Sequence, residues 1–133
     1  MRISTVLVAA VAAIAISGCA PSRPAKALPQ DFLNKVMDSA FAKTIADECR
    51  FIGFNDAYYE RVFQAEATKL AYKGYTQYDL NHAARQFKRD PSVKRRAMKM
   101  VEDRKIDVYS EQSWCNAGKR EKARKTAIGR YLL

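Results

Sequence analysis

Three cysteines and one histidine are the side chains best suited to covalent, redox or metal chemistry in this chain of 133 residues. Cys49 and Cys115 are far apart in the sequence, and neither belongs to the CxxC motif that dithiol oxidoreductases use. Together with His82 they offer fewer ligands than a structural zinc site requires. We therefore expect no metal, no cofactor and no cysteine-based catalysis.

Acid–base catalysis has equally few candidates. His82 lies next to the expected apolar side of a short helix, which favours a structural imidazole over a general base. Several carboxylates could supply an acid and a base for glycan cleavage, namely Asp47, Glu48, Glu60 and Glu66. Asp47 and Glu48, however, are adjacent on a predicted helix and so point in different directions. Because the sequence has no GxSxG, HExxH, P-loop or Rossmann motif, we expect a non-enzymatic protein, with a small cell-wall-acting envelope enzyme as the alternative.

The first 18 residues have the composition of an export signal. Arg2 supplies a positive charge, an almost unbroken apolar run extends from Ile3 to Ile16, and Ser17 and Gly18 are the small residues of a cleavage site. The apolar run has about 14 residues, whereas a helix needs roughly 20 to cross a bilayer. The pattern therefore favours a cleaved signal peptide over a retained membrane-spanning helix.

The residues around Cys19 resemble the lipobox of bacterial lipoproteins. Ile16-Ser17-Gly18-Cys19 provides a branched aliphatic residue, two small residues and the cysteine that accepts a diacylglyceryl group. The resemblance implies lipidation of Cys19, and two or three acyl chains form a lasting membrane tether. An ordinary secretory signal or an uncleaved anchor is the alternative. Ala20 is not the aspartate that retains lipoproteins in the inner membrane, so the resemblance implies the outer membrane, with the domain facing the periplasm or the exterior.

Lipidation of Cys19 would leave an even pair of cysteines in an oxidising compartment. Pairing of Cys49 with Cys115 closes a loop of about 66 residues, which on the chain-entropy model contributes roughly 4 kcal/mol of stability. Two buried free thiols are the alternative. The cysteine count thus favours one disulfide.

The rest of the chain predicts a short spacer and one helical domain. Residues 19–30 comprise the lipidated cysteine and a flexible spacer, in which Pro21, Pro24 and Pro29 prevent helix formation. Over residues 31–133, apolar residues recur every three or four positions, without the sustained alternation of strands. We therefore expect an all-α fold: a compact bundle of four or five short helices, closed by one disulfide.

Capping residues divide this domain into helices. Asp31 can cap or charge the first helix, which ends near Cys49. Asn55 can cap the second, and Gly74 can close it in a left-handed conformation. Thr76 and the pair Asp90-Pro91 mark the starts of the third and fourth helices. A loop at residues 107–110 leads to a last helix, which we expect to have Trp114 and Cys115 in its first turns and Ile128, Leu132 and Leu133 at its end.

Short motifs in the second half of the chain carry a second resemblance. They are Ser113-Trp114-Cys115, the ending Ile128-Gly129-Arg130-Tyr131-Leu132-Leu133, the mid-chain step Gly74-Tyr75-Thr76 and the early Cys49. With these motifs, roughly residues 45 to 133 resemble a small family of exported alphaproteobacterial domains of unknown function. The resemblance implies a helical fold and the disulfide, and it implies no activity.

Positive charge is concentrated in the C-terminal half. Without the signal peptide the chain has 23 Lys and Arg against 14 Asp and Glu. Residues 88–105 contain eight basic and three acidic residues, and residues 119–130 contain six and one, whereas residues 31–66 have more acidic than basic residues. Such an asymmetric charge attracts and steers anionic partners. The residues that we expect to bind an anionic partner are Lys94, Arg95, Arg96, Lys99, Arg120, Arg124 and Lys125.

These features predict a membrane-anchored envelope lipoprotein that binds a protein partner or an anionic lipid or glycan through a basic C-terminal face. A solvated basic surface without a partner is the plain alternative, and a periplasmic chaperone or inhibitor with an exposed apolar groove is another. Nucleic acid fits the charge but not the location. Tyr75 and Tyr78, in a turn between predicted helices, are further interface candidates because tyrosine is enriched at binding surfaces.

Overall fold

The structure is a computed structural model that describes residues 23–133. Its helices are α1 (Gln30–Glu48), α2 (Asp56–Tyr72), α3 (Gln77–Arg89), α4 (Pro91–Asp103) and α5 (Glu111–Ala123), followed by the short 3-10 helix η1 (Gly129–Tyr131). Within residues 23–133 no strand forms beyond an isolated bridge between Phe54 and Leu132. The predicted all-α fold of four or five helices is therefore confirmed, with five.

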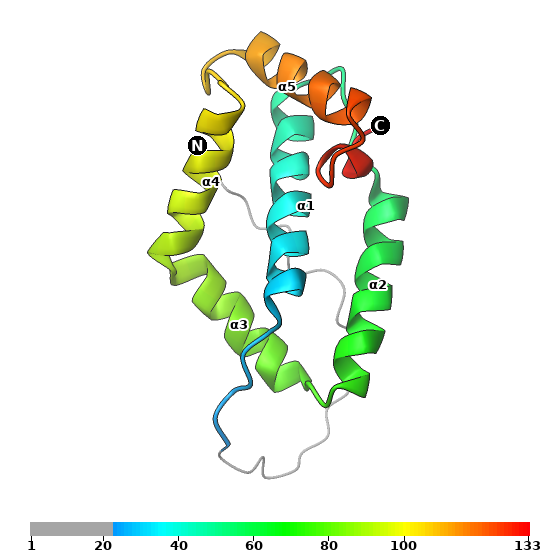
Figure 1. Cartoon of the computed structure of the whole chain (residues 1–133), viewed down its shortest axis with the longest axis vertical. Coiled ribbons are helices and arrows are strands. Elements are labelled where there is room, and N and C mark those ends of the chain that lie inside the picture. Colours follow the sequence, from blue (N-terminus) through cyan, green and yellow to red (C-terminus); the bar gives the residue numbers. More distant parts are fainter. Residues whose placement is uncertain (1–22) are drawn as a thin grey trace.

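Helix α1 is the central element (Figure 1). Helix α2 runs along one side of it, α3 and α4 form a bent arm along the other side, and α5 crosses its C-terminal end. The turn between α2 and α3 lies at the opposite end of the molecule from α5. The two ends of the long axis are thus formed by different segments, which matters for the placement of the predicted sites.

The predicted caps begin three of the helices. The Asn55 side chain accepts a 3.0 Å hydrogen bond from the Tyr58 amide, and Asp90 accepts a 2.8 Å bond from the Ser92 amide, with Pro91 at the first helical position. Thr76 and Asp79 form a capping box at α3. Asp31 does not cap α1, which begins after Pro29. Its negative charge lies in the first turn of the helix, where it interacts favourably with the helix dipole.

Three helices end in a residue with left-handed backbone conformation. Gly74 has a φ of 77° after α2, as its position predicts, and the Tyr75 amide donates to the Leu70 carbonyl. Lys105 (φ 54°) and Lys125 (φ 51°) occupy the same position after α4 and α5. A residue with a Cβ is strained in this conformation, so glycine at either lysine position would relieve backbone strain.

The core lies where α5 crosses α1. Cys49 and Cys115 form the predicted disulfide there, with 5.1 Å between their Cα atoms. Around them are packed the buried apolar residues Phe41, Ala42, Ile45, Ile52, Val101, Ile106, Trp114, Ala117, Ile128, Tyr131 and Leu132. A Cβ on Gly118 would lie 2.5 Å from the Ile52 side chain and 2.7 Å from that of Ile45, so glycine allows α5 its close approach. The disulfide and a close helix crossing therefore define one well-packed end.

The structure of the C-terminal segment differs from the sequence prediction. The last helix ends at Ala123, so Ile128, Leu132 and Leu133 do not lie on it. Lys125 reverses the chain, which then folds back so that the Tyr131 carbonyl accepts from the Asn55 amide and the Leu133 amide donates to the Gly53 carbonyl, each at 2.8 Å. Ile128 and Leu132 are still buried, but they reach the core from this returning segment rather than from a helix.

The α3 end is packed more thinly than the α5 end. No apolar side chain of α3 is fully buried, and its only buried residue is Asp79. Leu80, Ala83 and Phe87, the larger part of its apolar side, are half-buried, and Ala84 is exposed. The apolar stripe of α3 therefore lines open space rather than a closed core.

Candidate functional site

The residues predicted to bind an anionic partner are all exposed. Lys94, Arg95, Arg96 and Lys99 lie on α4, while Arg120, Arg124 and Lys125 lie on the last turns of α5 and just after it. Lys99 donates a 2.8 Å hydrogen bond to Asp103. The other six make no ion pair within residues 23–133, so their charges are available to a partner.

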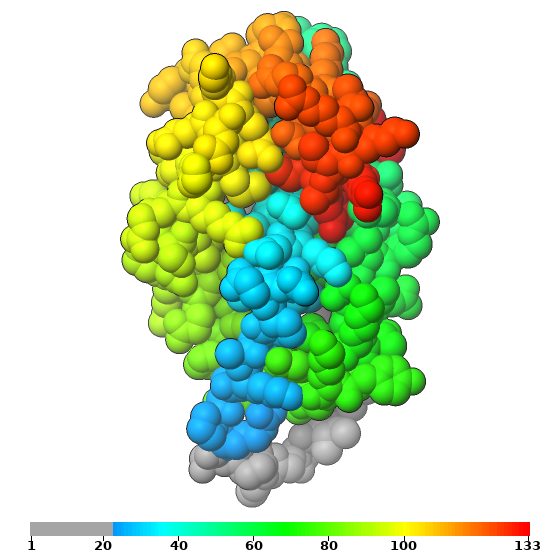
Figure 2. All heavy atoms as spheres, viewed as in Figure 1, coloured from blue at the N-terminus to red at the C-terminus, as the bar shows by residue number. Residues whose placement is uncertain are grey.

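The helices bring some of these residues together and separate others. Arg95 and Lys99, and likewise Arg120 and Arg124, are four positions apart, so each pair shares a helix side. Arg120 reaches the C-terminal end of α4, where its Nη2 donates to the Arg104 carbonyl at 2.9 Å. The surfaces of α4 and α5 adjoin at this end (Figure 2). Lys94 lies about 15 Å before Arg104 along α4, at the other end of that helix.

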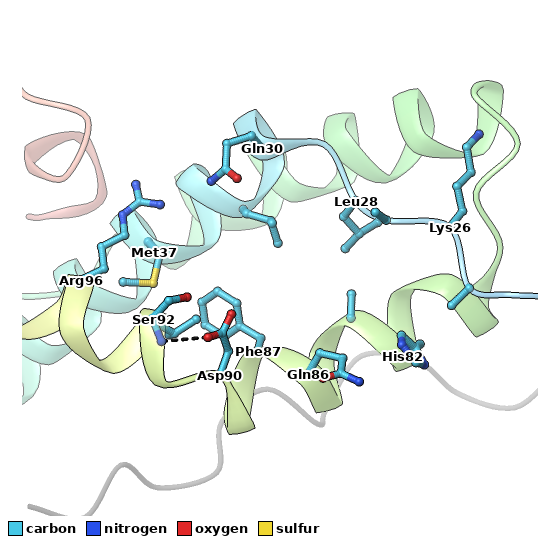
Figure 3. A pocket seen from close by; sticks show the side chains of 15 residues that line it. Lys26, Leu28, Gln30, Met37, His82, Gln86, Phe87, Asp90, Ser92 and Arg96 are labelled. Atoms are coloured by element: carbon cyan, nitrogen blue, oxygen red, sulfur yellow. Dashed lines mark hydrogen bonds between the residues drawn. The ribbon is translucent and has the colours of Figure 1, made fainter.

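Arg96 lies at a pocket that the sequence did not predict (Figure 3). We call it the α3–α4 pocket; its volume is about 370 Å³, and it lies between α3, α4, the start of α1 and the segment before α1. Its apolar lining consists of Ala25, Ala27, Leu28, Leu33, Met37, Ala83, Phe87 and Val93. Its polar lining consists of Lys26, Gln30, His82, Gln86, Asp90, Ser92 and Arg96. An apolar hollow of this kind is what the chaperone alternative requires.

The polar groups of the α3–α4 pocket differ in how far they are already engaged. The Asp90 carboxylate is held by the Ser92 amide, and this hydrogen bond lowers the pKa of Asp90 below its usual value. Arg96 makes no ion pair within the described residues, and it extends from α4 beside Met37 (Figure 3). His82 is half-buried on α3. The pocket therefore offers apolar surface and one available guanidinium.

One wall of the α3–α4 pocket is a segment that we call the strap, residues 23–29. Asp79 is completely buried, and it accepts hydrogen bonds from the Arg23 guanidinium, the Lys26 amide and the Thr76 amide, each at 2.8 Å. The Arg23 guanidinium, together with these two amides, holds the pKa of Asp79 well below its usual range. The Tyr75 hydroxyl also donates to the Ala27 carbonyl at 3.0 Å.

The strap lies within the stretch predicted to be a flexible spacer. It is extended, in line with its prolines, yet it is fixed by side chains from the α2–α3 turn. A sequence signal for the cap existed in Thr76-Gln77-Tyr78-Asp79, a capping box in which Asp replaces the usual Glu. Nothing local indicates that the same Asp79 carboxylate also binds residues more than 50 positions earlier.

A second pocket lies between α1, α2 and the C-terminal segment. This α1–α2 pocket has a volume of about 300 Å³ and is lined by Lys35, Asp38, Tyr58, Val62, Ala65, Glu66, Ala127, Arg130 and Tyr131. Burial raises the pKa of the half-buried Asp38, whereas hydrogen bonds from Lys35 and Lys69 lower the pKa of Glu66. Burial also raises the pKa of Tyr131 to about 12. Two carboxyl groups with oppositely shifted pKa values therefore share one concave site.

The carboxylates proposed from sequence for acid–base chemistry are mostly elsewhere. Asp47 is exposed and pairs with Lys43 at 2.7 Å, and Glu48 and Glu60 are exposed as well. Glu66 alone lines a pocket. Asp38 was missed because it sits one position after Met37 on the apolar side of α1, where only the packing of α2 and of Tyr131 makes a pocket.

The C-terminal segment is positioned by a partly buried ion pair that sequence reasoning also missed. Arg104 Nε donates to Glu121 at 2.8 Å, and Thr126 donates to the other oxygen of the same carboxylate. The Arg104 guanidinium lies 5.1 Å from the Phe41 ring centre. Arg104 thus links α4 to α5 and the core, and it is not available for a partner.

Two of the three cysteines lie in the described part of the chain. Cys49 and Cys115 are consumed by the disulfide, and Cys19 lies outside the described residues. Over residues 23–133, no three His, Cys, Asp or Glu side chains are grouped as metal ligands would be. Among the helices of the same residues, none is both long and apolar enough to cross a membrane.

Comparison with protein families places the chain in a family. A family described as a family of unknown function (DUF5333) matches residues 27–133. The match begins within the strap and includes all five helices, so it extends further toward the N-terminus than the resemblance seen from residue 45. No curated protein and no solved structure matches the chain significantly.

Proposed function

We propose that the chain, which belongs to the DUF5333 family of unknown function, is an exported lipoprotein that presents a basic surface to an acidic partner. In this proposal residues 1–18 are a signal peptide, and fatty acyl chains such as palmitate on Cys19 anchor the mature chain in the outer membrane. The helical domain lies in the periplasm or outside the cell. It acts by binding, not by catalysis.

The observation that carries the proposal is the separation of the strap from α5. Arg23 is fixed to Asp79 at the start of α3, while Arg120 and Arg124 lie on α5 at the other end of the long axis (Figure 1). An anchor on Cys19, four positions before Arg23, would join the domain at the α3 end. The basic residues of α5 would then face away from the anchoring membrane, toward a partner that is not that membrane.

The charges on α4 and α5 support such a role. Six of the seven predicted residues make no ion pair in the described part of the chain, so a partner would not have to displace a carboxylate from any of them. Exposed charges at the edge of a binding surface mainly increase the rate of association, and this effect decreases as the ionic strength rises. An acidic protein surface or an anionic glycan satisfies this chemistry.

Anchoring is tested with Cys19→Ser in the full chain expressed in its own envelope. The proposal expects the wild-type chain in the membrane fraction, with an N-terminal peptide of increased mass that incorporates an alkynyl palmitate analogue. Cys19→Ser should lose the label and the mass increase. Ser17→Ala is the matched control, because alanine keeps a small residue at that position. Equal labelling of wild type and Cys19→Ser would refute lipidation at this residue.

Partner binding is tested by photo-crosslinking from positions 95 and 120 in the native envelope, followed by mass spectrometry. The proposal expects one defined adduct from both positions and none from position 119, on the other flank of α5. The double variant Arg120→Glu/Arg124→Glu should abolish the adduct formed from position 95. Lys119→Glu/Lys122→Glu changes the net charge equally and should leave that adduct intact. Loss of the adduct in both double variants would mean that net charge, and not this surface, drives association.

The carboxyl pair of the α1–α2 pocket favours a second candidate, a cell-wall glycan hydrolase. A carboxyl group with a raised pKa can act as general acid while an ionised neighbour acts as base or nucleophile, here Asp38 and Glu66. The test is release of soluble glycan from purified peptidoglycan by the mature protein. Asp38→Asn should abolish the release, and Asp47→Asn should not. Absence of release by the wild-type protein would eliminate this candidate.

A further inference from the structure

We propose that the α2–α3 corner, residues 67–78, together with the strap, rests on the anionic headgroups of the bilayer that holds the Cys19 anchor. The inference deepens the proposed function and rests on its lipid anchor. It assigns the end of the molecule opposite α5 to membrane contact (Figure 1). The partner is a lipid surface with negative charge.

Covalent geometry keeps the corner close to the anchor. Cys19 and Arg23 are four residues apart, and an extended chain spans at most about 3.6 Å per residue, so the anchor lies within about 14 Å of Arg23. The strap does not add to this reach, because the Arg23 guanidinium is bound to the buried Asp79 at 2.8 Å. The Lys26 amide binds the same carboxylate. The corner is therefore held near the membrane surface by the chain itself.

The corner exposes tyrosines that have no structural role in the core. Tyr72, in the last turn of α2, is 91% exposed, and Tyr78, in the first turn of α3, is 49% exposed. Neither side chain makes a hydrogen bond within the described residues. Tyrosine is enriched where membrane meets water, because its ring is apolar and its hydroxyl prefers water. Tyr75, the third, is used internally and holds the strap.

The charges of the corner complement an anionic surface. Residues 67–78 contain Lys69 and Lys73 and no Asp or Glu. The nearest acidic side chains, Glu66 and Asp79, are buried and paired with lysine or arginine. Lys26, on the strap, and Lys73 make no ion pair within the described residues. The Lys26 ammonium donates a 2.7 Å hydrogen bond to the Lys73 carbonyl and lies 4.2 Å from the Tyr75 ring centre, so its positive charge is held at the corner without a carboxylate partner. Each basic residue near an anionic bilayer is attracted to its headgroups, so two lysines without a carboxylate partner, beside exposed tyrosines, suit this surface.

The chain contains a natural control at its other end. Tyr109 is 96% exposed in the loop between α4 and α5. Its surroundings differ from the corner, since residues 102–111 contain four acidic and two basic residues. Exposure alone therefore does not predict membrane contact. Tyr109 should remain in water when Tyr72 touches the bilayer.

The experiment uses the full mature protein, purified with its acyl chains and reconstituted into vesicles of phosphatidylethanolamine and phosphatidylglycerol. Single variants Tyr72→Cys, Tyr78→Cys and Tyr109→Cys are labelled with a polarity-sensitive fluorophore, and the vesicles contain headgroup-linked nitroxide quencher. The disulfide and the lipid leave the introduced cysteine as the free thiol. We expect a blue shift and strong quenching at positions 72 and 78, and neither effect at position 109.

The outcomes separate this inference from the function on which it rests. Mass spectrometry of the purified protein is done first, and a chain without acyl groups would overturn the anchor and the inference with it. An acylated chain with unquenched fluorophores at 72 and 78 would overturn the inference alone. A further variant, Lys73→Gln in the Tyr78→Cys background, leaves the hydrogen bond from Lys26 to the carbonyl of residue 73 in place and should reduce quenching. Replacing phosphatidylglycerol by phosphatidylcholine should reduce it severalfold. Quenching that is insensitive to both changes would overturn the role assigned to anionic headgroups.

Discussion

Arg23 and Asp79, 56 positions apart in the chain, meet in an ion pair with a 2.8 Å nitrogen–oxygen distance, and the carboxylate has no exposed surface. This contact joins the segment before α1 to the first turn of α3. It turns residues that have the composition of a linker into one wall of the α3–α4 pocket. The first prediction follows from it.

Replacement of Asp79 by Asn should release the strap. The neutral amide keeps the size of the side chain but loses the charge that the Arg23 guanidinium and the Lys26 and Thr76 amides surround. We expect faster amide hydrogen exchange at Lys26 and faster proteolysis at residues 23–29, with the helices still folded. Asp47→Asn, which removes an exposed partner of Lys43, is the control and should leave both measurements unchanged.

The same contact gives a pH dependence with a defined sign. The pKa of Asp79 is lowered in the folded state, so the carboxylate stabilises the docked strap above its unfolded pKa of about 3.9, and this stabilisation is lost as the pH falls through the lowered value. Strap protection measured by hydrogen exchange should therefore be constant near neutral pH and decrease only in strong acid. Loss of strap protection between about pH 5 and 7, where histidine titrates, would contradict this assignment.

Removal of the disulfide should cost the domain roughly 4 kcal/mol of unfolding free energy, the chain-entropy value for a loop of about 66 residues. Urea denaturation of Cys49→Ala/Cys115→Ala against wild type measures this. The same comparison under reducing conditions should erase the difference. Equal stability in oxidising buffer would show that the cross-link does not constrain the unfolded chain as expected.

Replacement of Lys105 by Gly should stabilise the domain. Lys105 has a φ of 54° after α4, and a left-handed residue with a Cβ costs roughly 1 kcal/mol that glycine avoids. We expect a rise of about 1 kcal/mol or slightly less in the unfolding free energy, because glycine also increases the entropy of the unfolded chain. Lys94→Gly, on the exposed side of α4, has the same change in charge and should instead destabilise by about 1 kcal/mol.

Asp38 should oppose folding at neutral pH. Burial raises its pKa in the folded state, so the folded chain binds more protons than the unfolded chain, and stability falls as the pH rises through the raised value. Asp38→Asn should remove this trend and be at least as stable as wild type at pH 7. Thermal unfolding of both proteins from about pH 4 to 8 compares the slopes, and a wild-type chain that gains stability over this range relative to Asp38→Asn would contradict the assignment.

Local signals in the sequence predicted the helices and most of their ends. Asn55, Thr76, Asp90 and Gly74 act at the positions where a cap or a left-handed residue was expected, because each works through hydrogen bonds within a few residues. The disulfide was also predictable, since it follows from an even number of cysteines in a domain that the sequence predicts to be exported. The turn after α5 could not be predicted, because lysine at position 125 is not a residue type that indicates a left-handed backbone.

The pockets could not be predicted in the same way. Asp38, Glu66 and Tyr131 lie on three different elements, and only the return of the C-terminal segment brings Tyr131 beside the other two. The strap is similar, since Asp79 binds residues 53 and 56 positions away. The predicted basic residues were found exposed on α4 and α5, but their distribution over two helices, with Arg96 turned to a pocket, depends on packing that composition does not encode.

The Cys49–Cys115 disulfide also sets the route that mechanical force would take through the domain. Between Arg23 and α5, the shortest covalent path follows the strap and α1 to Cys49 and then crosses to Cys115, bypassing residues 50–114. Tension between an N-terminal anchor and a partner held at Arg120 would therefore load α1, one sulfur–sulfur bond and the part of α5 from Cys115 to Arg120. Helices α2, α3 and α4 would carry little of it, and the domain could transmit a pull without being unravelled from its middle.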